Sequence, residues 1–130
     1  AAELAGEVMS DVCEVPAGEC FRLGWQVEGE GLIAEVIEAE PSELIKGLNT
    51  WSVSLSSGAG EPLEGCAISL APYMPDHGHG SNVVESVEVE AGRYRLEGFD
   101  LIMPGYWELP LVTTCPAFEG EQTLLYGVWL

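Results

Sequence analysis

The sequence predicts an all-β protein, an immunoglobulin-like antiparallel β-sandwich of seven or eight strands. Apolar residues recur at every second position over most of the chain, which is the period of a strand with one buried face. Glycine- and proline-containing turn sequences separate these runs. The length of 130 residues fits a single domain. Short alternating runs with such turns between them are typical of a sandwich.

The individual strands follow from this alternation. The first run extends from Phe21 to Val27, and the others begin near Trp51, Cys66, Val87, Tyr94, Trp107 and Thr123. Trp25, Trp51 and Trp107 fall on the buried side of their runs and are predicted to be core residues, whereas the position of Trp129 stays open.

Two segments depart from the simple alternation. The apolar residues of segment 32–37 fall at i, i+1, i+4 and i+5, which suits a helix face, but three of the four are β-branched, and Gly31 and Pro41 bracket them. We therefore predict a strand there. Residues 1–18 are rich in Glu, Ala and Gly and are predicted to form an N-terminal arm, either a short helix or a loose segment, before a sandwich domain at 19–130.

The charge of the chain excludes two classes of partner. Twenty-two acidic residues against four basic ones give a net charge of −18. A nucleic-acid binder needs a basic surface, and an anionic membrane attracts cations, so neither partner is expected. The 47% of apolar residues exclude a disordered acidic tail. No apolar run approaches the roughly 20 residues that cross a bilayer.

Four cysteines without a Cys-x-x-Cys pair favour disulfides and an oxidising compartment, so we expect a periplasmic, cell-surface or secreted protein. Cys66 and Cys115 both point inward in their strands, and Cys13 and Cys20 are separated by six residues. We predict the pairs Cys13–Cys20 and Cys66–Cys115. The two other connectivities and four unpaired thiols remain as alternatives.

Both histidines lie in the sequence Met74-Pro75-Asp76-His77-Gly78-His79-Gly80. The two glycines leave the backbone free to direct both imidazoles to one point. Met74 adds a thioether, and imidazole with thioether is a ligand set for copper in particular. A second Met-Pro pair begins at Met103, which is either a further ligand or a core filler. The alternative for the whole segment is an ordinary exposed turn.

No sequence motif predicts an enzyme. The chain lacks the nucleophile elbow, the zinc-protease motif and the nucleotide-binding loops. Two histidines cannot build a three-histidine zinc site. The carboxylates are expected to lie on solvated faces rather than to form a catalytic pair, and no calcium-binding loop is present.

The chain resembles the YtkA-like and FixH-like group of bacterial envelope domains in three motifs that occur in the same order. These motifs are residues 74–80, Gly92-Arg93-Tyr94 and Met103-Pro104-Gly105-Tyr106-Trp107. The resemblance covers about half of the chain. It implies an immunoglobulin-like sandwich, an extracytoplasmic location and a role in copper handling or metal-linked assembly. Carried over position by position, the implied ligands are Met74, His77, His79 and Met103. The four cysteines and the strand around Trp25 depart from the group's pattern.

Two functions are therefore expected from the sequence. The first is a non-enzymatic extracytoplasmic domain that holds or transfers copper, as Cu(I) or Cu(II), through Met74, His77, His79 and Met103, with another envelope protein as a further partner. The second is an adhesion or assembly module, in which the histidine loop is structural and the acidic surface or a sheet edge contacts another protein.

Overall fold

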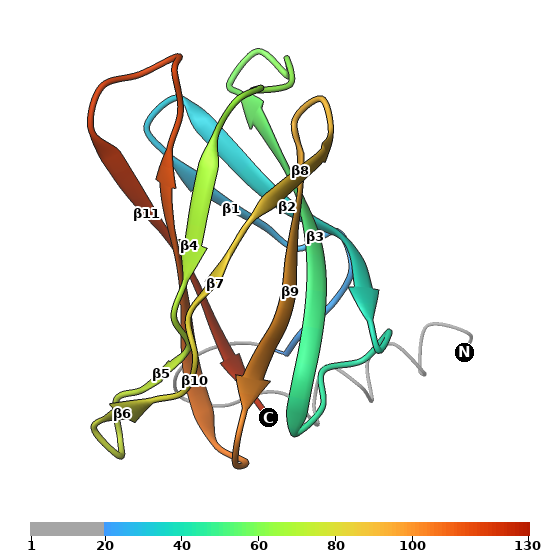
Figure 1. Ribbon diagram of the computed structural model, residues 1–130, viewed down its shortest axis with the longest axis vertical. Coiled ribbons are helices and arrows are strands. Elements are labelled where there is room, and N and C mark those ends of the chain that lie inside the picture. Colours follow the sequence, from blue (N-terminus) through green and yellow to red (C-terminus); the bar gives the residue numbers. More distant parts are fainter. Residues whose placement is uncertain (1–19) are drawn as a thin grey trace, which may run out of the picture.

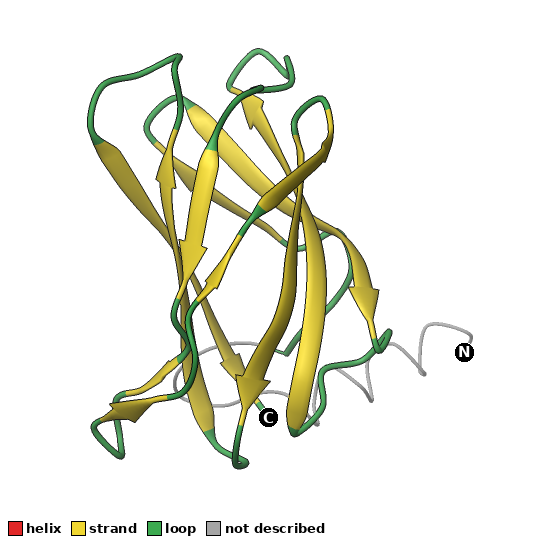
Figure 2. Cartoon of the chain, viewed as in Figure 1, coloured by secondary structure: helices red, strands yellow, loops and turns green. Residues whose placement is uncertain are grey.

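A computed structural model describes residues 20–130 as two antiparallel β-sheets packed face to face (Figures 1 and 2). No helix occurs in this part of the chain, and consequently none that could span a membrane. The predicted all-β sandwich is confirmed. The predicted arm at 1–18 lies outside the described residues.

The first sheet has the order β1-β2-β3-β9-β8. Its strands are β1 (Gln26–Gly29), β2 (Leu32–Glu40), β3 (Gly47–Ser57), β9 (Arg93–Leu101) and β8 (Val87–Glu90). The second sheet is built around β10, which pairs with β11 along one edge and with both β4 and β5 along the other. Its strands are β4 (Ala67–Leu70), β5 (Tyr73–Met74), β6 (His79–Gly80), β7 (Val84–Glu85), β10 (Tyr106–Thr114) and β11 (Glu121–Trp129).

The number of strands agrees with the prediction once interruptions are considered. Residues 20–130 contain eleven strand segments. β4 and β5 are two parts of one strand that lies beside β10, and β6, β7 and β8 follow one another with short breaks. Counting each of these two groups as one interrupted strand gives eight strands.

The first predicted strand begins later than expected. The alternation starts at Phe21, but β1 begins only at Gln26, and Leu23 is 56% exposed. Gly24 has a φ of +86°, which turns the backbone before the strand, and its N–H donates to the carbonyl of Val36. Trp25 is nevertheless buried in the core, as predicted.

Segment 32–37 forms a strand, as predicted, and its helix-like spacing has two sources: Ile33 is half-buried on the outer face of β2, and a β-bulge follows Val36. Leu32, Ala34 and Val36 alternate on the buried face of β2. A β-bulge between Val36 and Glu38 then inserts one residue, Ile37, into the pairing with β3. An extra residue shifts the phase of the alternation, so the apolar pattern is not strictly periodic.

The core lies between the two sheets and is centred on aromatic rings. Trp51 meets Phe99 and Tyr126 edge-on, at ring-centre distances of 5.2 and 5.4 Å. The hydroxyl of Tyr126 donates to the carbonyl of Trp25 at 2.8 Å. Burial raises the pKa of Tyr126 well above its usual value. Trp107 is fully buried as predicted, whereas Trp129 is only half-buried.

The disulfide Cys66–Cys115 is present, as predicted. Thr114 pairs with Ala67, so the two cysteines continue the same register between β10 and β4. The bridge therefore joins neighbouring strands of one sheet. Cys20 is also disulfide-bonded, while its predicted partner, Cys13, lies outside the described residues. For Cys20, Cys66 and Cys115, the alternative of unpaired thiols is wrong.

Replacing Cys66 and Cys115 together with alanine is expected to lower the free energy of unfolding by about 4 kcal/mol. The two residues are 49 positions apart, so the bridge removes the entropy of a long loop from the unfolded chain. Chemical denaturation of both proteins measures the difference. A loss below about 1 kcal/mol would contradict the chain-entropy account.

The stability of the protein is expected to fall as the pH rises above about 10. Tyr126 ionises near that pH in the unfolded chain, but its raised pKa keeps the proton bound in the native state. The native state then binds more protons than the unfolded state, and the free energy of unfolding decreases by up to about 1.4 kcal/mol per pH unit for this one residue.

Denaturation at a series of alkaline pH values measures this slope. Tyr94 and Tyr106 add to it in the same direction, because burial raises the pKa of both. Tyr126→Phe should be less stable near neutral pH but should lose stability less steeply above pH ~10. Equal slopes for the two proteins would show that Tyr126 is not responsible.

Candidate metal site

The predicted metal loop is a short β-hairpin, β5–β6, at one end of the second sheet (Figure 1). The backbone N–H groups of His77 and Gly78 both donate to the carbonyl of Met74, at 3.1 and 2.9 Å, which closes the turn. Gly78 has a φ of +67°, a conformation that favours glycine. At Gly80, a side chain would meet the carbonyl oxygen of Pro72, because a Cβ there would lie 2.7 Å from it.

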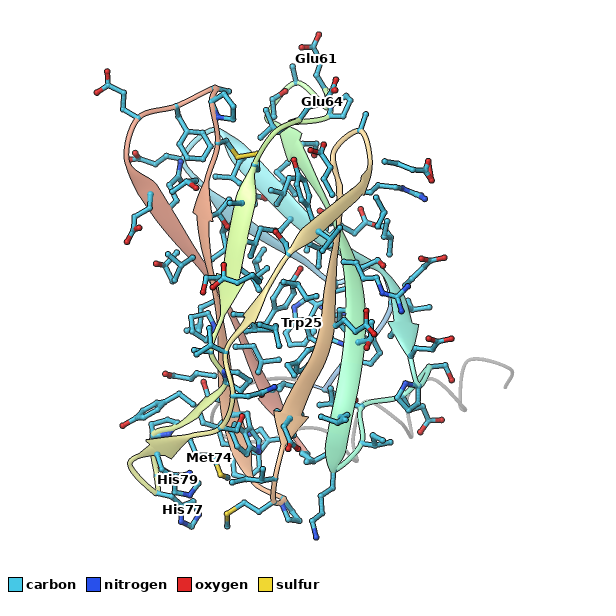
Figure 3. All side chains as sticks on the ribbon, in the orientation of Figure 1. Trp25, Glu61, Glu64, Met74, His77 and His79 are labelled. Carbon is cyan, nitrogen blue, oxygen red and sulfur yellow. A yellow bond between two sulfur atoms is a disulfide. The ribbon has the colours of Figure 1, made fainter. Side chains whose placement is uncertain are left out.

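The hairpin brings Met74, His77 and His79 together, as Figure 3 shows. Met74 and His79 are directly paired across the two strands, so their side chains lie on the same face of the hairpin. The ring centres of His77 and His79 are 5.7 Å apart. The three side chains differ in depth: Met74 is fully buried, His79 is half-buried and His77 is exposed.

The turn that carries Met103 packs against the hairpin. A Cβ on Gly105 would lie 2.7 Å from the terminal methyl carbon of Met74. Gly105 exchanges two backbone hydrogen bonds with Leu130, and the indole N–H of Trp107 donates to the carbonyl of Met103 at 2.9 Å. Met103 itself is half-buried and contacts the core. The structure therefore brings the Met103 turn beside Met74. Met103 also packs against the core, and core filling was the second of the two roles predicted for it.

The distance between the imidazoles fits a shared metal ion. A copper or zinc ion lies about 2 Å from each ligating ring nitrogen and hence about 3 Å from each ring centre, so two rings on one ion have centres about 4–6 Å apart, depending on the angle at the metal. The observed 5.7 Å is within this range.

Carboxylates contribute little to this site. Within residues 20–130, no three His, Cys, Asp or Glu side chains gather in a way that could hold a metal ion. Asp76 is in the turn, but its charge acts on Tyr106: burial, followed by the negative charges of Glu108 and Asp76, raises the pKa of Tyr106. The remaining candidate donor on the hairpin is the thioether of Met74, which is paired with His79.

A groove that was not predicted from the sequence lies on the outer face of the first sheet. The groove has a volume of about 390 Å³ and is lined by Leu23, Ile37, Glu38, Ala39, Glu40, Thr50, Ser52 and Arg95. Nε of Arg95 lies 3.4 Å from a carboxylate oxygen of Glu97 but is not in hydrogen-bonding geometry with it. Ser52 is only 8% exposed although it points outward. Outward serines in a strand are typical of an ordinary solvated face, so the sequence pattern does not predict a groove there.

Comparison with known proteins bears on the fold and on the hairpin. No curated protein and no solved structure matches the chain significantly. The family model described as YtkA-like matches residues 31–112, which is more than half of the chain and includes all four candidate ligands. The match begins just before β2 and ends within β10. The chain therefore belongs to the YtkA-like family.

Proposed function

We propose that this protein is a non-enzymatic, extracytoplasmic domain that holds or transfers copper through His77, His79 and Met74, with Met103 as a further thioether. The observation that carries the proposal is the geometry of the hairpin. Met74 pairs directly with His79, and the ring of His77 lies 5.7 Å from that of His79. In this proposal, one ion contacts the thioether of Met74 and both imidazoles.

The donor types favour copper over other common ions. Calcium and magnesium require several oxygen ligands, and the hairpin offers one carboxylate, Asp76. Of the 20 residues between Glu64 and Glu85, only Asp76 is acidic. Thioethers bind Cu(I), and imidazole binds both oxidation states of copper. Selectivity thus comes from neutral donors, while the net charge of −18 raises the local concentration of cations at low salt.

The proposed location and partner follow from the same features. Disulfides persist in oxidising compartments, which supports a periplasmic, cell-surface or secreted protein. In this proposal copper is the cargo, and another envelope protein supplies it or receives it. The exposed position of His77 at the tip of the hairpin supports such an exchange, because an incoming ligand reaches this imidazole first.

The copper proposal predicts that the purified protein competes with a metal chelator for copper more strongly than free histidine does. Replacing His77 and His79 together with alanine should weaken copper binding by about tenfold or more, because both nitrogen donors are lost. Titrations with Cu(II), and with Cu(I) under anaerobic conditions, measure both affinities.

Asp76→Asn is the matched control, because it lies in the same turn and removes the carboxylate of the hairpin itself. It should change the affinity by no more than about threefold. The proposal fails if the wild-type protein binds copper no more tightly than free histidine, or if the variant lacking both histidines binds as well as the wild type.

A second candidate function, the adhesion or assembly module, is favoured by the outer face of the second sheet. An antiparallel sheet that faces water normally alternates apolar and polar residues. At the centre of the first sheet the outward residues are polar, for example Ser54 paired with Glu35 and Arg93, although Ile33, Ile37 and Val87 also lie on its outer face. The outward positions of the second sheet include Tyr73, Tyr106, Pro110, Val112, Leu125 and Trp129.

This apolar face is suited to contact with another protein, since aromatic residues are enriched at interfaces. Leu125→Glu would place a charge on it at a residue that is 45% exposed. If the domain is an assembly module, cross-linking in its native compartment should capture the partner with the wild type and with the variant lacking His77 and His79. It should not capture the partner with Leu125→Glu. Ser56→Glu, on the outer face of the other sheet, is the control and should keep the partner. The opposite pattern would favour copper handling.

A further inference from the structure

The hairpin presents its three donors at three different depths. His77 is exposed, His79 is half-buried, and Met74, directly opposite His79, has no exposed surface. An ion that reaches the imidazoles from solvent must therefore move inward to contact the thioether. The third donor of the site is in apolar surroundings, whereas the first two are accessible to water.

We propose that this hairpin is a Cu(I) site in which Met74 is the inner ligand beneath the two imidazoles, and that Cu(II) uses the imidazoles alone. This inference rests on the copper function proposed above and adds the oxidation state of the ion. It follows from the depth of Met74 and from the local sequence, in which Asp76 is the one acidic residue between Glu64 and Glu85.

The chemistry of the two ions separates them at such a site. Cu(II) prefers a tetragonal arrangement of nitrogen and oxygen ligands, for which the hairpin offers two imidazoles and water. Cu(I) accepts a soft thioether, and its smaller charge costs less to remove from water. A buried neutral sulfur thus strengthens the binding of Cu(I) and contributes little to that of Cu(II).

The surroundings of Met74 hold its side chain in place. Its terminal methyl carbon lies against Gly105, because a Cβ added to Gly105 would be only 2.7 Å from that carbon. Gly105 is fixed by its two hydrogen bonds to Leu130, and the same turn is held by the bond from Trp107 to Met103. A side chain that is already fixed by packing loses little further freedom when it binds an ion.

Met74→Leu tests the inference, because it removes the sulfur while nearly conserving the volume in the core. Cu(I) affinity is measured anaerobically on the full chain, with ascorbate as the reductant and a chromogenic Cu(I) chelator as the competitor. Cu(II) affinity is measured by competition with nitrilotriacetate. Met74→Leu should weaken Cu(I) binding by about tenfold or more and should change Cu(II) binding by no more than about threefold.

Met103→Leu makes the same exchange in the neighbouring turn and tests the further thioether separately. It should weaken Cu(I) binding less than Met74→Leu does. A direct signal comes from protein with ¹³C-labelled methionine methyl groups titrated with Ag(I), which resembles Cu(I) but has no accessible redox change. The resonance that disappears in Met74→Leu is that of Met74, and it should shift when Ag(I) is added to the wild type.

The outcomes separate this inference from the copper function itself. If Met74→Leu binds Cu(I) as well as the wild type, and the variant lacking both histidines does not, Met74 is a core residue only. The inference then fails while the copper function stands. An Ag(I)-insensitive Met74 resonance would overturn it in the same way. If the wild type binds neither ion more tightly than free histidine, both fail together.

Discussion

The structure of the second sheet depends on the pairing of β10 along both of its edges. β11 follows it over nine residues on one side, whereas the other side is shared by β4 and, after a break, β5. The disulfide fastens one end of this divided edge. At the other end, β5 is joined to β10 by the single register pair Tyr73–Glu108, and the hairpin is also held by the burial of Met74 and by hydrogen bonds from Ser81 and Asn82 to β9.

The fold was predictable from the sequence wherever alternation was regular. Trp51 and Trp107 lie in the core because every second residue of their strands faces inward, and the same phase placed Cys66 and Cys115 together. The prediction was wrong at the start of β1, because the alternation continued through a turn at Gly24 that residue types alone do not distinguish from a strand. The bulge at Ile37 was likewise visible only as an irregular period.

The candidate site was predictable only in part. His77, His79 and Met74 lie within six residues of one another, so any tight turn would gather them. Which of these side chains share a face of the hairpin depends on the length of the turn. The pairing of Met74 with His79 places these two on the same face. The proximity of Met103 is tertiary and arises from the contact between Met74 and Gly105. The difference in burial between the three donors, on which the choice of oxidation state rests, has no counterpart in the local sequence.

The hydroxyl of Tyr126 also determines how the chain can reach its native state. Tyr126 is in the last strand, yet it donates to the carbonyl of Trp25, 101 positions earlier, and lies 3.2 Å from that of Ala34. The contact of β11 with β1 joins the same distant segments. Because such contacts form only after a long loop closes, they slow folding relative to local contacts. A nascent chain that lacks β11 cannot complete its core, so the β5–β6 hairpin gains the support of the Gly105 turn, which is bonded to Leu130, only when synthesis of the sandwich is finished.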